Sequence, residues 1–307
     1  MQANQPMNQH NQIEHPAVAR ARNHGDYGIL AAILLIIGAI LFMVVVFMFV
    51  FGQFLSDYAA EEDFGAGVEI LFWGFFLIGL MVFMMVLIRM MRQEFLGNCL
   101  QIEFSDYAWL RDWANTVSAD LRMPHVEIFV TQNPFINAFA LGFMRPYNIV
   151  LNSGAIRYLT DDELRVVVLH EMAHIKYGHT KVGVYTGAIT ALPFFGHIFG
   201  WMLNFFYRRA EYTCDSLAYF YIGNPELIKQ ALIKVYVGPD VACSFNETAR
   251  QWQQHHTNNL FNLFTQTFST HPFLVRRLSN IDKLHANFYT QMMQYPHPQM
   301  GQQYPQP

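Results

Sequence analysis

Residues 166–174 read VVVLHEMAH and contain an H-E-x-x-H pattern formed by His170, Glu171 and His174. Residues four apart lie on one face of an α-helix, so both imidazoles can bind the same metal ion. Glu171 follows His170 directly, where its carboxylate can act as general base on a metal-bound water. The alternative is a pair of hydrogen-bonded core histidines on an apolar helix. The spacing, with the glutamate in register, favours a metal site.

The ends of this segment support a helix over residues 161–177. Thr160 followed three residues later by Glu163 is typical of a capping box at a helix start. Asp161 and Asp162 add negative charge to the first turn, where it interacts favourably with the helix dipole. Neither proline nor glycine interrupts the segment. The H-E-x-x-H pattern is therefore expected on a continuous helix.

The composition excludes some classes of function. The 307 residues are 53% hydrophobic and only 14% charged, which is lean for a soluble protein. A net charge of −4 gives no support for a nucleic-acid partner. Cys99, Cys214 and Cys243 are an odd number at no metal-binding or disulfide spacing. We therefore expect free thiols on the reducing side of a membrane.

Two apolar runs, at residues 29–51 and 70–88, are each long enough to cross a bilayer. The loop between them is acidic and contains neither Lys nor Arg, whereas the outer flanks carry Arg20, Arg22, Arg89 and Arg92. The positive-inside rule therefore predicts a transmembrane helical hairpin over residues 27–92, with the rest of the chain in the cytoplasm. A buried hairpin of a soluble protein is the alternative, and charge-free runs of this length disfavour it.

The ends of the chain, residues 1–26 and 291–307, are rich in Gln, Asn, His and Pro, and we expect disordered tails there. The remaining segment, residues 93–290, is expected to be mainly α-helical with a small β-sheet before the metal helix. Within it we expect helices over residues 93–123 and 225–237, an amphipathic stretch over 245–268, a helix up to Met293, and strands over 125–130, 137–141 and 148–152.

The strand over residues 137–141 has a candidate role in substrate binding. In zinc proteases of this plan, an edge strand beside the metal lets an extended peptide add as a further strand. Asn137, Ala138 and Phe139 are the candidate residues here. An ordinary core hairpin would produce the same sequence pattern, so both interpretations stay open.

A catalytic zinc ion takes three protein ligands and keeps a water, so a third ligand must follow the two histidines. The H-E-x-x-H-x-x-G-x-x-H arrangement fails because Tyr177 and Thr180 occupy the required glycine and histidine positions. A later helix offers Glu211 and Asp215, which are four apart and share one face. One can bind zinc while the other steadies a histidine ligand. A solvated acidic pair beside Arg208 is the alternative.

Together these motifs resemble the HtpX-like membrane metallopeptidases, which are related to the CAAX prenyl proteases. The resemblance covers residues 93–290, and the two preceding apolar runs are in keeping with it. The matching segments, in the family's order, are NAF at 137–139, HEMAH at 170–174, RAEYTCDSLA at 209–218, and STHP at 269–272 followed by Arg277.

The resemblance implies a zinc endopeptidase with one Zn²⁺ per subunit, bound by His170, His174 and Glu211. It also implies that Asp215 lies behind the site, that His271 stabilises the oxyanion and that Arg277 supports this region. The implied setting is a bacterial inner membrane, with the catalytic domain in the cytoplasm. Protein and peptide substrates, including misfolded membrane proteins, would be degraded there in quality control.

One departure from the family concerns residues 182–207, because such proteins usually carry two hydrophobic spans between the metal helix and the third ligand. Here the segment is too short for two straight spans, and Pro193 divides it. Glu211 can share a metal with His170 only if the chain returns to the same side. We therefore expect an apolar hairpin that dips into the membrane or lies on it.

Two further functions were weighed. An intramembrane protease is disfavoured because charged residues, among them Arg165 and Lys176, crowd the metal helix. A catalytically silent scaffold or chaperone that retains the fold is disfavoured by Glu171, since a structural zinc site has no use for a base beside an open position.

Overall fold

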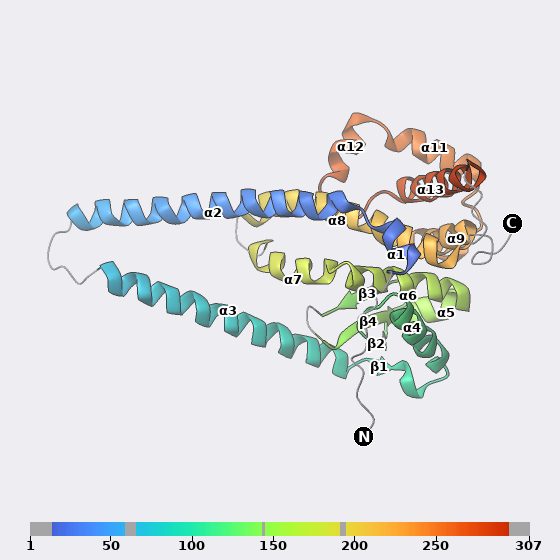
Figure 1. The fold of residues 1–307 in the computed structure, drawn as a ribbon, viewed down its shortest axis with the longest axis horizontal. Helices are drawn as coiled ribbons and strands as arrows, with labels where there is room; N and C mark the ends of the chain where they lie inside the picture. The colour runs from blue at the N-terminus through green and yellow to red at the C-terminus, as the bar shows by residue number, and fades with distance from the viewer. Residues whose placement is uncertain (1–13, 59–65, 143–144, 191–194, 295–307) are drawn as a thin grey trace, which may run out of the picture. The chain divides into compact units, whose positions relative to one another are not determined.

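The structure is a computed structural model that describes residues 14–58, 66–142, 145–190 and 195–294 (Figure 1). The predicted tails over residues 1–13 and 295–307 lie outside the described residues. The chain divides into two compact units, residues 27–100 and the remainder, which are described separately below.

The unit of residues 27–100 is built from two long helices, α2 (His24–Tyr58) and α3 (Ala66–Gly97). Among the described residues, α2 is the one helix that is long and apolar enough to cross a membrane by length and composition, with a mean hydropathy of 3.3. Many of its large apolar side chains are exposed, Phe42 and Phe47 among them. The second predicted span, residues 70–88, lies within α3.

Residues 14–26 are not part of a disordered tail, which corrects the prediction for that part of residues 1–26. They form the short helix α1 (Pro16–Ala21), which packs on α8, and the start of α2. Ala17 and Val18 are completely buried, and the Tyr177 hydroxyl donates a hydrogen bond of 3.2 Å to the Val18 carbonyl. Three buried apolar side chains, Ala17, Val18 and Ala21, are too few to produce a periodic signal in a polar segment.

The sheet has the strand order β1-β2-β4-β3, from β1 (Leu100–Gln101), β2 (Val126–Thr131), β4 (Tyr147–Asn152) and β3 (Ala138–Leu141). β2 pairs with β4 in parallel, and β3 pairs with β4 antiparallel. Every residue of β4 is buried. The strand proposed to receive a substrate, β3, therefore lies at an edge of the sheet, as its role requires.

The loop before β3 is held close to the helix after β4. Gly154 lies in α5 (Ser153–Tyr158), and a Cβ at this position would come within 2.2 Å of the Pro134 carbonyl oxygen. Ser153 Oγ also accepts a hydrogen bond of 3.1 Å from the Asn133 N–H. Glycine is therefore required at position 154 for the two backbones to approach.

The helix predicted over residues 93–123 is wrong in its first part. α3 ends at Gly97, β1 and the 3-10 turn η1 (Ile102–Phe104) follow, and the helix proper is α4 (Ala108–Asp120). Ser105 Oγ donates to the Ile102 carbonyl and accepts from the Tyr107 N–H, so its side chain competes with helical hydrogen bonding.

The metal helix, α6 (Asp161–Lys176), has the predicted bounds and the predicted capping box. The Glu163 N–H donates to Thr160 Oγ1 over 3.3 Å, and the Thr160 N–H donates to Glu163 Oε2 over 2.8 Å. The buried Glu163 carboxylate also accepts a hydrogen bond from Lys234 Nζ, at 2.7 Å. The start of α6 is thus stabilised by its own capping residues and by Lys234 of α9.

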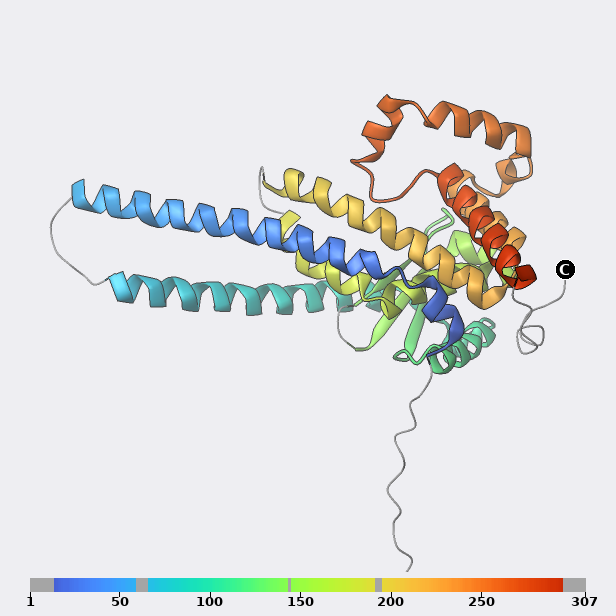
Figure 2. The ribbon, with the colours of Figure 1, turned by 45° about the horizontal axis from the view of Figure 1, so that its top comes forward.

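Helix α6 lies between the sheet and the helices α8 and α9, so its two faces meet different elements (Figures 1 and 2). The predicted helices over 225–237 and up to Met293 are confirmed as α9 and α13. The amphipathic stretch over 245–268 is two helices rather than one. The remaining helices are α7 (His179–Thr190), α8 (Phe195–Ile222), α9 (Pro225–Val237), α10 (Pro239–Ala242), α11 (Glu247–Thr257), α12 (Leu260–Gln266) and α13 (Leu274–Gln294).

Candidate metal centre

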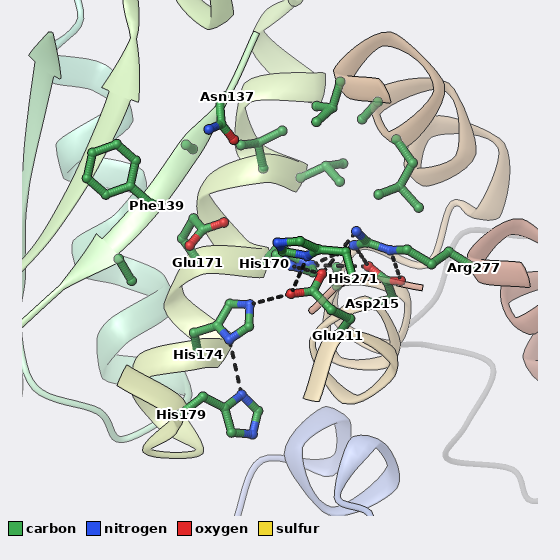
Figure 3. A pocket seen from close by; sticks show the side chains of 18 of the residues that line it. Asn137, Phe139, His170, Glu171, His174, His179, Glu211, Asp215, His271 and Arg277 are labelled. Carbon is green, nitrogen blue, oxygen red and sulfur yellow. Dashed lines mark hydrogen bonds and ion pairs between the residues drawn. The ribbon is translucent and has the colours of Figure 1, made fainter. Parts of the chain in front are cut away.

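Helices α6 and α8 bring His170, His174 and Glu211 together (Figure 3). His170 Nε2 lies 3.3 Å from Glu211 Oε2, and His174 Nε2 lies 3.4 Å from Glu211 Oε1. Two imidazoles and one carboxylate are a donor set used by catalytic zinc ions, which keep their fourth position for water. The residues at this point therefore fit a zinc ion.

Glu171 lies on the side of His170 that faces β3, away from Glu211 (Figure 3). Burial raises the pKa of its carboxyl group, and the imidazoles of His174 and His170 and a hydrogen bond from the Ala140 backbone partly offset this effect. A carboxylate with a raised pKa is a stronger base than one in water. The group next to the candidate metal ligands is therefore suited to accept a proton.

Behind the ligands, Asp215 and Arg277 form a buried ion pair. Arg277 donates hydrogen bonds of 2.8 and 2.6 Å to the two oxygens of Asp215, and its Nη1 lies 3.0 Å from Glu211 Oε2. Asp215 Oδ1 lies 3.1 Å from His170 Nδ1. The Asp215 carboxylate thus contacts Nδ1 of His170, whereas Nε2 of the same ring faces Glu211. This contact determines the ring's tautomer and orientation.

These contacts set the charges of the buried groups. Burial would raise the pKa of Glu211 and of Asp215, but the Arg277 guanidinium and hydrogen bonds from the neighbouring histidines together outweigh it and lower both pKa values. Burial would lower the pKa of His170, but its hydrogen bonds to Asp215 and Glu211 raise it to about 10. In the metal-free protein the ring of His170 is therefore protonated, and its positive charge takes the place of the metal cation.

The side chain of His271 is largely exposed, at 60%, and it lies at the mouth of the cavity. Its Nδ1 lies 3.1 Å from Glu211 Oε1. It comes from the segment before α13, so the site draws on three separate parts of the chain.

His179 takes part in the cluster, although its spacing did not indicate it. Gly178, with a φ of +72°, turns the chain between α6 and α7 and places His179 beneath His174. The two Nδ1 atoms lie 3.2 Å apart, and burial lowers the pKa of His179 to about 3. The ring is therefore neutral at physiological pH and is positioned to hold the tautomer of His174.

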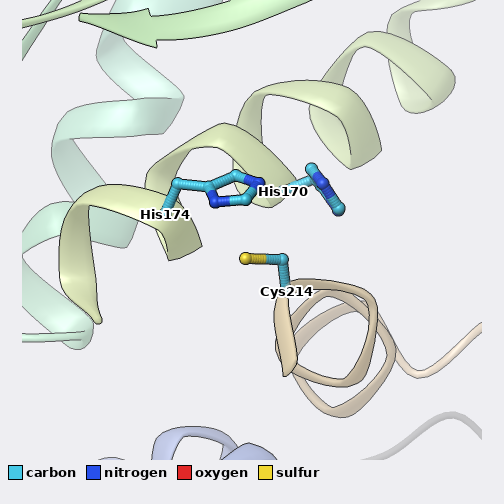
Figure 4. Close-up of side chains that lie close together, drawn as sticks. All are labelled: His170, His174 and Cys214. Atoms are coloured by element: carbon cyan, nitrogen blue, oxygen red, sulfur yellow. The ribbon is translucent and has the colours of Figure 1, made fainter. Parts of the chain in front are cut away.

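Cys214 is the second group that the spacing did not reveal (Figure 4). Its thiol is completely buried, and ligand atoms of His170, His174 and Cys214 all lie within 4.8 Å of one another. Burial raises the pKa of this thiol well above its ordinary value, so it is protonated. The Glu211 carboxylate is the better candidate for the third ligand, because its two oxygens face the Nε2 atoms of His170 and His174 at 3.3 and 3.4 Å, whereas Cys214 Sγ contacts His179 Nδ1 at 3.6 Å.

The cluster opens into a cavity of ≈ 620 Å³. Asn137, Ala138 and Phe139 of the edge-strand region line one side, together with Glu171. Helix α9 supplies an apolar wall on another side. The residues of α9 that line the cavity are Ile228, Ala231, Leu232, Val235 and Tyr236. The space therefore combines a strand edge, a basic carboxylate and an apolar surface.

Comparisons with known proteins give the family of the chain. Residues 105–285 match Peptidase family M48. The chain is 27% identical over 215 residues to the plastoglobule-localized metallopeptidase 48 of Arabidopsis thaliana, covering 64% of this chain and 62% of that protein. It is 25% identical over 211 residues to a protease HtpX homolog of Bacteroides fragilis, covering 54% of this chain and 65% of that protein.

Among solved structures, the chain is similar to Ste24p of S. mikatae, with 15% identity and a TM-score of 0.48, over 85% of this chain and 67% of that one. Because this score is below 0.5, the family assignment rests on the sequence matches. The first curated relatives are matched over about three-fifths of their length.

A helical domain with a small mixed sheet and an H-E-x-x-H helix facing a glutamate belongs to the metallopeptidase class. The match over residues 105–285 identifies the family within that class: the chain belongs to peptidase family M48, and it is HtpX-like.

Proposed function

We propose that this chain is a membrane-anchored zinc endopeptidase that hydrolyses peptide bonds of proteins at the cytoplasmic face of a membrane. The observation that carries the proposal is the convergence of His170 Nε2 and His174 Nε2 on the carboxylate of Glu211, at 3.3 and 3.4 Å. Glu171 borders the same cavity beside the edge strand. Neither a scaffold nor a structural metal site requires that combination.

The residues that would hold one Zn²⁺ are His170, His174 and Glu211. When bound there, zinc supplies Lewis acidity that lowers the pKa of water and polarises a carbonyl. Asp215 orients the ring of His170, and His179 orients that of His174. Arg277 keeps both acidic side chains ionised, so the donor set is ready for a divalent cation.

The proton steps belong to Glu171. It accepts a proton from a water in the cavity as the oxygen attacks the peptide carbonyl, and it passes that proton to the leaving amine. His271, at the mouth, donates a hydrogen bond to the carbonyl oxygen as negative charge develops on it. The substrate backbone adds to the edge of β3, with Asn137, Ala138 and Phe139 as the receiving segment.

The membrane setting rests on helix α2 and on the charge distribution around it. The transmembrane hairpin over residues 27–92 would have both ends in the cytoplasm because its flanks are basic and its loop is acidic. The segment 182–207 would cross the bilayer an even number of times, including zero, because His174 and Glu211 must share one side. Misfolded or membrane proteins are the substrates that fit this position, as in membrane-protein quality control.

The test compares wild type with Glu171→Gln, using bound zinc and hydrolysis of an unfolded membrane protein. The variant should keep one zinc per chain and lose hydrolysis by about 10²–10⁴-fold, since a general base contributes that much. Unchanged hydrolysis in the purified variant would contradict the mechanism. Loss of hydrolysis accompanied by loss of zinc would show that Glu171 holds the metal and is not the base.

A further inference from the structure

Helices α11 and α12 form an arm that extends away from the rest of the unit before the chain enters α13 (Figure 2). From residue 251 to residue 275 the sequence contains no Asp, Glu, Lys or Arg. The arm nevertheless carries many large apolar side chains, and most of them are exposed. The exposed ones are Trp252, Leu260, Phe261, Phe264 and Phe268.

The apolar side chains of α12 share one face. Leu260, Phe261 and Phe264 recur at helical spacing, and Leu260 and Phe261 are 84% and 73% exposed. Phe268, two residues beyond the end of α12, packs against Phe264 with ring centroids 5.3 Å apart. On α11, the exposed Trp252 stacks on His256 with ring centroids 5.2 Å apart. A monomer in water rarely presents so many large apolar side chains together, so this face is expected to meet an apolar phase.

Both ends of the arm are fastened to the rest of the unit. At its start, Arg250 forms an ion pair with Asp282 of α13. At its end, Arg208 Nη1 donates hydrogen bonds to the carbonyl oxygens of Gln266, Thr267 and Ser269, at 2.9, 3.0 and 2.7 Å. The apolar face is therefore held in place from two sides.

The second attachment joins the arm to the apolar half of α8. Trp201, Phe205 and Arg208 recur at helical spacing on α8, and the two aromatic side chains are each 47% exposed. Asn204 on the same helix donates a hydrogen bond of 2.9 Å to the Phe268 carbonyl. The exposed aromatic face of α12 thus continues the exposed face of the segment that we propose to meet the membrane.

We infer that the apolar face formed by Leu260, Phe261 and Phe264 of α12, with the adjoining Phe268, inserts into the interfacial layer of a lipid bilayer, as an amphipathic helix does. The contact is apolar, because residues 251–275 contain no Asp, Glu, Lys or Arg side chain to attract anionic headgroups. His271 directly follows the arm and lies 3.1 Å from Glu211, so the bilayer contact would also locate the mouth of the active site at the membrane surface. The inference rests on the proposed membrane anchoring of the chain.

The test uses the full chain in phosphatidylcholine nanodiscs, one chain per disc, with and without brominated acyl chains. Cys99→Ser and Cys243→Ser leave only Cys214, whose buried thiol is protected from labelling. An environment-sensitive fluorophore is attached at Phe261→Cys and, as the matched control, at the exposed Thr116→Cys on α4. The brominated lipids should quench the probe at 261, with a blue-shifted emission, and leave the probe at 116 unchanged at both low and high salt.

Equal quenching at positions 261 and 116, or loss of quenching at high salt, would overturn the inference. Protection of position 261 that needs two chains per disc would do the same, because it would identify a second copy as the occupant. A chain that fails to copurify with the discs would instead overturn the membrane anchoring. A probe at Phe268→Cys should lose most of its quenching when Phe261→Ser and Phe264→Ser are combined; unaltered quenching there would reject this face.

Discussion

Helix α8 buries carboxylate side chains in one half and exposes aromatic side chains in the other. In the half towards Ile222, Glu211 and Asp215 are almost completely buried. In the half towards Phe195, Trp201 and Phe205 are each about half exposed, at 47%. Soluble proteins normally bury the second kind and expose the first.

The difference follows from what surrounds each half. The buried carboxylates have a guanidinium and imidazoles within hydrogen-bonding distance, and such partners offset the cost of removing charge from water. Beside the exposed aromatics, the Arg208 guanidinium lies 6.0 Å from the centre of the Phe205 ring, and it donates hydrogen bonds to the backbone carbonyls of Gln266, Thr267 and Ser269. One helix therefore joins a polar reaction centre to an apolar docking surface, and the contrast can be tested from either end.

The largest effect is expected in the polar half, at the proposed metal ligand Glu211. Glu211→Ala should abolish stoichiometric zinc binding, because it removes one of three protein ligands. Cys214→Ser, one turn further along the same helix, should leave zinc content unchanged, since the Cys214 thiol contacts His179 while Glu211 faces both ligand imidazoles. Metal analysis of both purified variants checks this, and the reverse ranking would make Cys214 the third ligand.

A smaller loss, of turnover, is expected when His271 at the mouth of the cavity is changed. His271→Ala should lower the turnover of a peptide substrate by about 10²–10³-fold while zinc content stays at one per chain, because an oxyanion donor acts only in the transition state. Steady-state kinetics beside metal analysis distinguishes the roles. A variant that loses its zinc would show that His271 holds the metal.

The next largest effect is expected at Asp215, which contacts the proposed ligand His170. Asp215→Asn should weaken zinc affinity or activity by roughly 10–100-fold, which is typical when the partner of a ligand histidine is changed. Competition with a chelator measures the affinity. A loss as complete as that of Glu211→Ala would place Asp215 on the metal instead.

The smallest effect is the pH dependence of the metal-free protein. The folded-state pKa of His170 is about 10, above its ordinary 6.5, so this group stabilises the fold below pH 6.5 and its contribution is lost as the pH rises towards 10. The pKa of His179 is lowered to about 3, so its contribution is present above pH 6.5 and is lost as the pH falls towards 3.

Thermal unfolding midpoints against pH, with the metal removed, check these two arms. His170→Asn should flatten the alkaline arm and His179→Asn the acidic one. Identical pH profiles for wild type and either variant would contradict the corresponding assignment.

Local sequence determined much of this protein. The capping residues Thr160 and Glu163 and the unbroken run after them define α6, because a helix start depends on contacts within one turn. The spacing of His170 and His174, and of Glu211 and Asp215, places each pair on one helix face for the same reason. The strand over residues 137–141 and its alternatives were also visible locally, whereas its position at the sheet edge depended on strand order.

Only the tertiary structure decided the rest, because those features depend on contacts between residues far apart in the chain. The packing of residues 14–26 onto α8, the ion pair of Arg277 with Asp215 and the arrival of His179 beneath His174 leave no periodic or spacing signal. The exposure of Phe261 and Phe264 was hidden for the same reason. A sequence pattern reports that a face is apolar, and burial depends on what the fold brings against it.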